Sequence, residues 1–240
     1  MNSQASHSQD RFATTRWSMV IQLDRESPLA RNALGELVQR YWYPVYAYVR
    51  RRDHSPDVAR NITRSVLHQL LRDESLLQPN APVGHYRSFL LERVHAFLAA
   101  GATTPPDDAD AALTPPADLE SRYLRDHAEP SSPDHAFQRS FALVVLHRSL
   151  RRLRDEAAQT GHLEMYRALE PYLARDPGSG EYERIAARLR SRQMTLVLAL
   201  KRLRQRLHEL AGEELSDTVS TASDLANEQN ALLAVLGELH

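Results

Sequence analysis

The segment from Tyr182 to Leu207 has the side chains and the spacing that contact with DNA requires. Its sequence, YERIAARLRSRQMTLVLALKRLRQRL, predicts a short amphipathic helix, a break, and a second helix that runs toward Leu210. Two helices joined by a short turn are typical of a helix-turn-helix, whose second helix enters the major groove. Basic and polar side chains at its start contact phosphates and base edges. The candidate DNA-binding residues here are Arg190, Arg192, Gln193, Thr195, Lys201 and Arg202.

Apolar side chains occupy the first turns of this second helix, where base-reading side chains are expected. At 100° per residue, one stripe of leucines is buried and the opposite face points outward. The buried stripe is Leu196, Leu200, Leu203, Leu207 and Leu210, and the outer face is Met194, Val197, Leu198 and Lys201. The apolar outer side chains can touch a thymine methyl, but they cannot form bidentate hydrogen bonds to guanine or adenine. Two interpretations stay open: a DNA-binding helix with weak base readout, or an apolar patch for a protein partner.

No arrangement of residues in the sequence predicts catalysis. The 11 histidines show no His-Glu-x-x-His spacing, and the 8 glycines form neither a phosphate loop nor a Gly-x-Ser-x-Gly elbow. The absence of cysteine excludes disulfides, thiolate zinc sites and thiol catalysis. We therefore expect a protein that is not an enzyme, needs no cofactor or metal, and acts by binding.

The net charge of −1 over 240 residues conceals an alternation along the chain. Residues 1–100 carry 13 arginines and 9 acidic residues, and residues 134–211 carry 15 basic and 9 acidic residues. Residues 101–133 have a net charge of −5, and residues 212–240 have −6. Two basic lobes with an acidic connector and an acidic tail suggest a protein that touches a polyanion twice. Two ordinary domains with solvated connectors are the alternative.

Composition divides the chain into five segments, and neither basic lobe shows strand alternation. The fold class we expect is all-α, with two small helical domains. The segments are a disordered N-terminus (1–11), a first helical domain (12–100), a flexible Pro/Asp-rich linker (101–133), a second helical domain (134–211) and an acidic C-terminal extension with a helix (212–240). A polar N-terminus and the lack of a bilayer-length apolar run predict a cytoplasmic protein without a membrane partner.

Helical periodicity is plain within both domains. The expected helices start at Trp17, run over 28–52, follow the Ser55-Pro56 cap, and cover 86–99, 140–158 and 163–173. One helical turn is expected inside the linker at 119–124. Pro44 lies within the second of these helices, which predicts a kink or break there.

Short motifs along the chain match those of one protein family. The motifs are TTRWS (14–18), RYWYP (40–44), YAYVRRR (46–52), Ser55-Pro56, RSFLL (87–91), AARL (186–189), RLR (202–204) and the segment 214–218. On these motifs the chain resembles the extracytoplasmic-function (ECF) sigma factors of bacterial RNA polymerase, in a subgroup with a long C-terminal extension. The resemblance covers nearly the whole chain apart from the linker.

The resemblance implies a division of labour between the two domains. A sigma region 2-like domain would dock on the β′ clamp of core RNA polymerase and open the promoter's minus-ten element. A sigma region 4-like helix-turn-helix domain would read the minus-thirty-five element. The implied partners are core RNA polymerase and promoter DNA, with an anti-sigma protein or a kinase as further candidates. In the first domain, the candidate DNA contacts are Arg87, Arg93 and His95.

The positions that match the family's polymerase-docking helix depart from its acidic pattern. They read Arg60, Asn61, Ile62, Thr63, Arg64 and Ser65, so that only Asp57 is acidic at the helix start. The candidate polymerase-binding residues are Asp57, Arg60, Asn61, Thr63 and Arg64. A phosphate on Thr63 would reverse the local charge, which makes Thr63 a candidate phosphorylation site.

Two functional interpretations follow from the resemblance and its departures. In the first, the chain is an ECF-type sigma factor that directs transcription initiation at specific promoters. In the alternative, it is a degenerate sigma-like protein that keeps the fold as a protein-interaction or regulatory scaffold with weak or no promoter readout. In either case the acidic C-terminal helix is a candidate inhibitor that masks a basic lobe.

Overall fold

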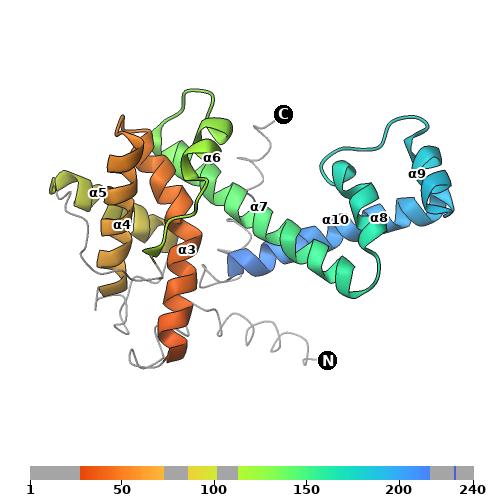
Figure 1. The fold of residues 1–240 in the computed structure, drawn as a ribbon, viewed down its shortest axis with the longest axis horizontal. Helices are drawn as coiled ribbons and strands as arrows, with labels where there is room; N and C mark the ends of the chain where they lie inside the picture. Colours follow the sequence, from red (N-terminus) through yellow and green to blue (C-terminus); the bar gives the residue numbers. More distant parts are fainter. Residues whose placement is uncertain (1–27, 73–85, 102–112, 217–229, 231–240) are drawn as a thin grey trace, which may run out of the picture. The chain divides into compact units, whose positions relative to one another are not determined.

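The fold is known from a computed structural model, in which residues 28–72, 86–101, 113–216 and 230 are described (Figure 1). These residues form helices and no strands, so the all-α prediction is confirmed. The chain divides into a first unit, Met1–Val144 with Leu215–His240, and a second unit, Val145–Glu214. The helices expected near Trp17 and within the C-terminal extension lie outside the described residues.

The centre of the first unit is α3 (Pro28–Arg50), whose second half is buried on all sides. Every residue from Arg40 to Val49 is buried, and the last residue of the helix, Arg50, is half-buried. The helix continues through Pro44, so of the kink or break expected there, the break does not occur. An internal proline costs a helix about 3 kcal/mol, and burial of the surrounding aromatic and aliphatic side chains offsets that loss.

Three helices cover α3 in the first unit. α4 (Pro56–Arg72) packs along it, α5 (Tyr86–Ala99) packs on α4, and the first turns of α7 (Pro133–Gln159) place Phe137 and Phe141 on Tyr41. The Tyr41 ring stacks on Phe141 with 5.4 Å between ring centroids. The division between the units consequently falls after Val144, within α7, whereas composition placed the second domain's start at 134.

Part of the expected linker is ordered and belongs to the first unit. α6 (Leu119–Asp126) forms where one helical turn was expected, and it buries Leu119 and Tyr123. Its Glu120 accepts two hydrogen bonds from the Arg50 guanidinium, at 2.8 and 3.0 Å, and one from the Tyr46 hydroxyl. The hydrogen bonds from Arg50 hold the pKa of Glu120 below its usual range. Residues 113–133 therefore pack on α3 instead of forming a free connector.

α6 ends at a buried histidine. The His127 ring is 6 % exposed, and its Nε2 lies 2.8 Å from the Ser140 hydroxyl on α7. Burial, and after it the positive charges of Arg139 and Arg51, lower the pKa of His127 to about 4, against the opposing effect of Asp126. His127 is thus neutral in the folded protein near neutral pH.

The second unit is built on two clusters of buried side chains. The first joins α8 (Leu163–Leu169), α9 (Glu181–Leu189) and the start of α10 (Gln193–Ser216). The second joins the end of α7 to α8 and to the far part of α10. The members are Ala168, Leu169, Ile185, Ala186, Leu196 and Leu200 in the first cluster, and Leu153, Ala157, Tyr166 and Leu210 in the second. A short 3₁₀ turn, η3 (Glu170–Tyr172), ends α8.

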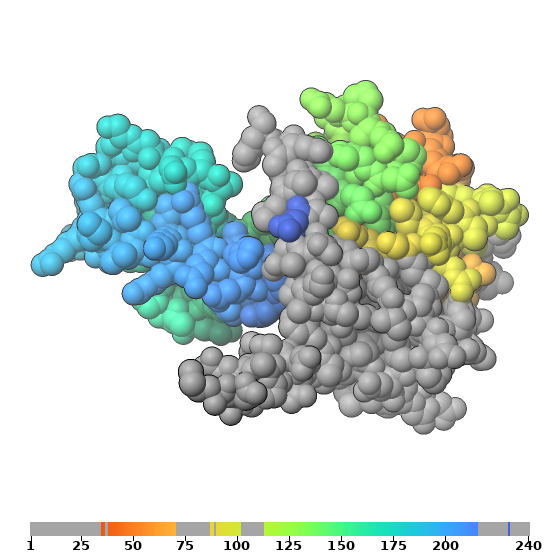
Figure 2. Space-filling model, turned by 180° about the vertical axis from the view of Figure 1, so that it is seen from behind, coloured from red at the N-terminus to blue at the C-terminus, as the bar shows by residue number. Residues whose placement is uncertain are grey.

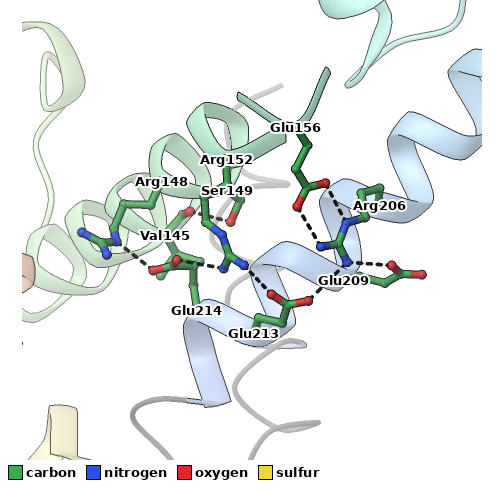
Figure 3. A network of polar contacts seen from close by, with 9 residues as sticks. All are labelled: Val145, Arg148, Ser149, Arg152, Glu156, Arg206, Glu209, Glu213 and Glu214. Carbon is green, nitrogen blue, oxygen red and sulfur yellow. Dashed lines mark hydrogen bonds and ion pairs between the residues drawn. The ribbon is translucent and has the colours of Figure 1, made fainter. Parts of the chain in front are cut away.

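A row of alternating charges also joins α7 to α10 in this unit (Figure 3). Glu214, whose side chain is only 6 % exposed, accepts hydrogen bonds from Arg148 at 2.7 Å and from Arg152 at 3.1 Å. Arg152 also pairs with Glu213. Earlier on α10, Arg206 pairs with Glu156, Glu209 and Glu213. The row neutralises charges on both helices within the unit.

The buried end of this row should contribute more to stability than its exposed middle. Glu214→Gln is expected to lower the free energy of unfolding by about 2 kcal/mol, because the partly buried Arg148 loses its counterion and Arg152 loses one of its two. Glu213→Gln, the matched change at a side chain that is 48 % exposed, should lower it by about 0.5 kcal/mol. Urea unfolding followed by far-UV circular dichroism measures both. Equal effects of the two variants would contradict this assignment.

Protonation of His127 should destabilise the fold in mild acid. An unfolded histidine has a pKa near 6.5, so the unfolded chain binds the proton first as the pH falls. The stability that neutral His127 provides is complete above pH 6.5 and is lost as the pH falls toward 4. Between pH 7 and pH 5 the wild type should lose about 2 kcal/mol more unfolding free energy than His127→Gln. Parallel slopes for the two proteins would show that His127 does not titrate this way.

Candidate nucleic-acid interface

α9 and α10 are joined by a three-residue turn, as the sequence predicts. The turn holds α9 by its last carbonyls: the Ser191 N–H donates to Ala186 at 3.0 Å, and the Arg190 N–H donates to Ala187. Arg190 has φ +49°, in the left-handed region that favours glycine. The turn therefore places an arginine where the backbone prefers a residue without a side chain.

The start of α9 is braced by a glycine and a glutamate. Gly180 precedes the helix with φ +75°, a conformation that glycine adopts without strain. Glu181 accepts hydrogen bonds from the Gly178 N–H and, at 3.0 Å, from the Tyr172 hydroxyl. The hydrogen bond from Gly178 lowers the pKa of Glu181. The loop before α9 thus ties this helix to the end of α8.

The inner face of α10 matches the predicted leucine stripe. Leu196, Leu200 and Leu210 are at most 2 % exposed, and Leu203 and Leu207 are half-buried. The outer face is open, with Met194 67 % exposed. In Figure 2, α10 belongs to the light-blue to blue part of this unit. Gln193 and Thr195 are exposed beside it. The predicted orientation of the helix is confirmed.

Apart from Arg184, which pairs with Glu181, the basic side chains of this segment fall into two groups. Arg204 and Arg206 are held inside the unit, Arg204 by Asp176 at 2.8 Å and by two loop carbonyls, Arg206 by Glu156 at 2.8 Å. A second group is exposed and, among the described residues, forms no ion pair or side-chain hydrogen bond. It consists of Arg188, Arg190, Arg192, Lys201 and Arg202. We call these five the open cations.

Four of the open cations were predicted from the sequence, and Arg188 was missed. Arg188 lies in the last turn of α9, one residue before the break, within the AARL motif. The prediction covered only the turn and the second helix, so it did not include a side chain at the end of the first helix. The structure gathers all five around the turn and the first turns of α10, where phosphate contacts of a helix-turn-helix are made.

The candidate DNA contacts of the first unit are less available. The Arg87 guanidinium lies 5.0 Å from the centroid of the Phe141 ring, and Arg87 is half-buried. The His95 ring lies 5.3 Å from that of Tyr48, and its Nε2 is 3.6 Å from the Asp134 carboxylate. Arg93 is exposed and has a partner within the protein. Arg87 and His95 thus contact other side chains of the unit, although His95 is still 47 % exposed.

The candidate docking residues on α4 do not all share a face. Asp57 and Asn61 are exposed, and Arg60 forms an ion pair with Asp57 at 2.8 Å. Arg64 is half-buried. Thr63 is fully buried, so the prediction that it faces a partner or accepts a phosphate disagrees with the structure. The buried face of α4 is wider than its apolar stripe, because Thr63 and Ser65 are buried along with Ile62 and Val66.

Val58 lies exposed at the start of α4. It is 40 % exposed, whereas Ala59 beside it is buried. Ile62, Val66 and Leu70 form the buried stripe further along the helix. The start of α4 therefore presents Asp57, Val58 and Asn61 together to the outside.

An open cavity of about 480 Å³ lies in the second unit between α7, α8 and α10. Its walls are mostly apolar, with Leu153, Met165 and Leu198 among them, and Arg202 and Arg206 at polar positions. Among the described residues, no group of three or more His, Asp or Glu side chains could hold a metal ion. No helix in the described part of the chain is long and apolar enough to cross a membrane.

Comparisons with known proteins assign no family or function to the chain. A scan against protein-family models, a search of curated proteins and a search of solved structures each found no match to the chain.

Replacing Arg190 should separate stability from binding. Arg190→Gly removes the strain of a side chain at φ +49°, so the free energy of unfolding is expected to rise by about 1 kcal/mol. The same change two residues earlier, Arg188→Gly, places glycine inside α9 and should lower it by about 1 kcal/mol. Both variants lose one open cation, and both should bind duplex DNA more weakly in a gel-shift titration. A loss of stability in Arg190→Gly would show that its side chain holds the turn.

Proposed function

We propose that the chain is a sigma factor of the ECF type, which binds core RNA polymerase and directs it to a promoter. The observation that carries the proposal is the set of open cations around the turn between α9 and α10. This surface coincides with the segment whose motifs resemble the family's promoter-reading domain. Five phosphate contacts would give a salt dependence of log K on log salt with a slope of about −4.5.

In this proposal, the start of α4 contacts the polymerase. The exposed Val58 offers apolar area, and the ion pair between Arg60 and Asp57 cancels one positive charge that would face the partner. Docking then depends on apolar burial more than on the acidic pattern of the family. Recruitment and strand opening proceed through binding energy, without a catalytic residue.

A second candidate function is the sigma-like scaffold that binds a protein in place of DNA. The observation that favours it is the apolar cavity beside α10, whose wall includes the exposed Leu198. An apolar surface of this kind suits a helix or an apolar side chain of a partner.

Retention of core RNA polymerase tests the proposal. The full chain, immobilised, is expected to retain core polymerase from the bacterium that encodes it. Val58→Arg should reduce retention at least tenfold, because a charge enters the apolar contact. Leu124→Arg makes the same change at an exposed apolar side chain on α6 and is the matched control, with retention unchanged.

The pair Arg60→Glu with Asn61→Asp separates the two candidate functions. If the chain is a sigma factor, the wild type retains core polymerase, and the variant with restored acidic residues retains it as well. Retention by the variant alone, with none by the wild type, would exclude polymerase binding by the unmodified chain and favour the scaffold.

A further inference from the structure

A stripe of exposed apolar side chains runs along the outer face of α10. Met194, Val197 and Leu198 are 67 %, 40 % and 49 % exposed, and their spacing of three and four residues puts them side by side. Only two other large apolar side chains in the described residues, Val58 and Leu124, are exposed to this degree. The three therefore form a continuous patch, whereas scattered exposed leucines are ordinary on a protein surface.

The stripe contributes little to the folding of its own unit. Leu196 and Leu200 on the opposite face already join α10 to α8 and α9. Large apolar side chains that face away from the core remain available for contact with another molecule. The question is which molecule the stripe contacts.

The charges around the stripe favour DNA over a protein. Lys201 continues the same face one turn further, and Arg190 and Arg192 stand at its start. None of these has an ion-pair partner among the residues that the structure describes. Further along the helix, Arg204 and Arg206 are paired within the unit. The unpaired charges thus accompany the apolar stripe, as a surface that meets both phosphates and base edges requires.

The chemistry of the stripe selects one feature of the major groove. Met, Val and Leu side chains have no hydrogen-bond donor, and the only apolar group on the base edges is the C5-methyl of thymine. We infer that Met194, Val197 and Leu198 read DNA sequence through thymine methyl groups, so that the site prefers T-rich duplexes. This inference rests on the proposed DNA-binding function and specifies what the site distinguishes.

The effect of each methyl contact can be estimated from apolar burial. Burying one methyl group against an apolar side chain improves binding about fourfold. Two or three contacts by the stripe would then give a preference of roughly tenfold or more. The open cations add affinity without regard to sequence and are the same for every duplex.

Removal of thymine methyls without any other change tests the inference. The full chain is used to select 30-base-pair duplexes from a random pool, and the selected duplexes are then prepared with deoxyuridine in place of thymidine. Deoxyuridine keeps every hydrogen-bonding group and lacks only the methyl. At fixed low salt, the Kd for the deoxyuridine duplexes should be at least tenfold weaker.

Two variants assign the effect to the stripe. Met194→Gln with Leu198→Gln should reduce the preference for thymidine over deoxyuridine duplexes to about fourfold or less, the share that Val197 alone can provide. Circular dichroism should show an unchanged fold, because both replaced side chains are exposed. Arg192→Gln is the control: it should reduce the salt slope by about 1 and keep the preference for thymidine.

Each remaining outcome identifies which statement fails. Equal binding of both duplexes by the wild type, with a steep salt dependence, overturns methyl readout and leaves DNA binding in place. No binding to either duplex at low salt overturns the DNA-binding function together with the inference. If the Met194 and Leu198 variant loses polymerase retention while its DNA binding is unchanged, the stripe is a protein contact.

Discussion

Burial of the leucine stripe of α10 is the interaction on which the second unit and its candidate site both depend. Leu196 and Leu200 pack on α8 and α9, and Leu210 packs on α7. These contacts set the rotation of α10 about its axis, and this rotation decides the environment of every other side chain on it. Arg204 and Arg206 are directed toward carbonyls and carboxylates of the same unit, and Met194 and Lys201 are directed outward. The candidate interface is thus a consequence of core packing.

A similar constraint organises the first unit. The buried half of α3 carries polar atoms at its edge, and these require partners once water is excluded. α6 supplies them: Glu120 accepts from Tyr46 and Arg50, and Asp126 accepts from the Tyr43 hydroxyl at 2.8 Å. Acidic residues that look like part of a solvated connector in the sequence therefore act as internal counterions. Their carboxylates are paired within the unit, so their negative charge does little to repel a polyanion.

Pairing within a unit also determines which basic side chains of the two lobes can reach DNA. Residues 134–211 carry 15 basic side chains, but net charge does not tell which of them can reach a phosphate. Arg148, Arg152, Arg204 and Arg206 are occupied by carboxylates of their own unit. The open cations, in contrast, lie on the last turn of α9, on the connection after it and on the first three turns of α10. Local pairing, more than the sum of charges, decides where such a protein can bind DNA.

The sequence was sufficient for the features that periodicity and capping control. It predicted the all-α class, the helices from Pro28, Pro56 and Tyr86, and the turn that precedes α10, because local propensity and the apolar period act over a few residues. The division of α10 into a buried and an outer face also followed from its 3.6-residue period. Four of the five open cations were therefore found from sequence alone.

Only the tertiary structure decided the features that depend on contacts distant in sequence. Continuation of α3 through Pro44, the docking of α6 on it, and the boundary within α7 all result from packing between segments far apart in the chain. The burial of Thr63 and the exposure of Val58 were set by the angle at which α4 meets α3, which no single helix encodes. Pairing of Arg204 and Arg206 but not of Arg202 was likewise decided by which carboxylates and carbonyls the fold brings within reach, because electrostatic pairing depends on distance in space.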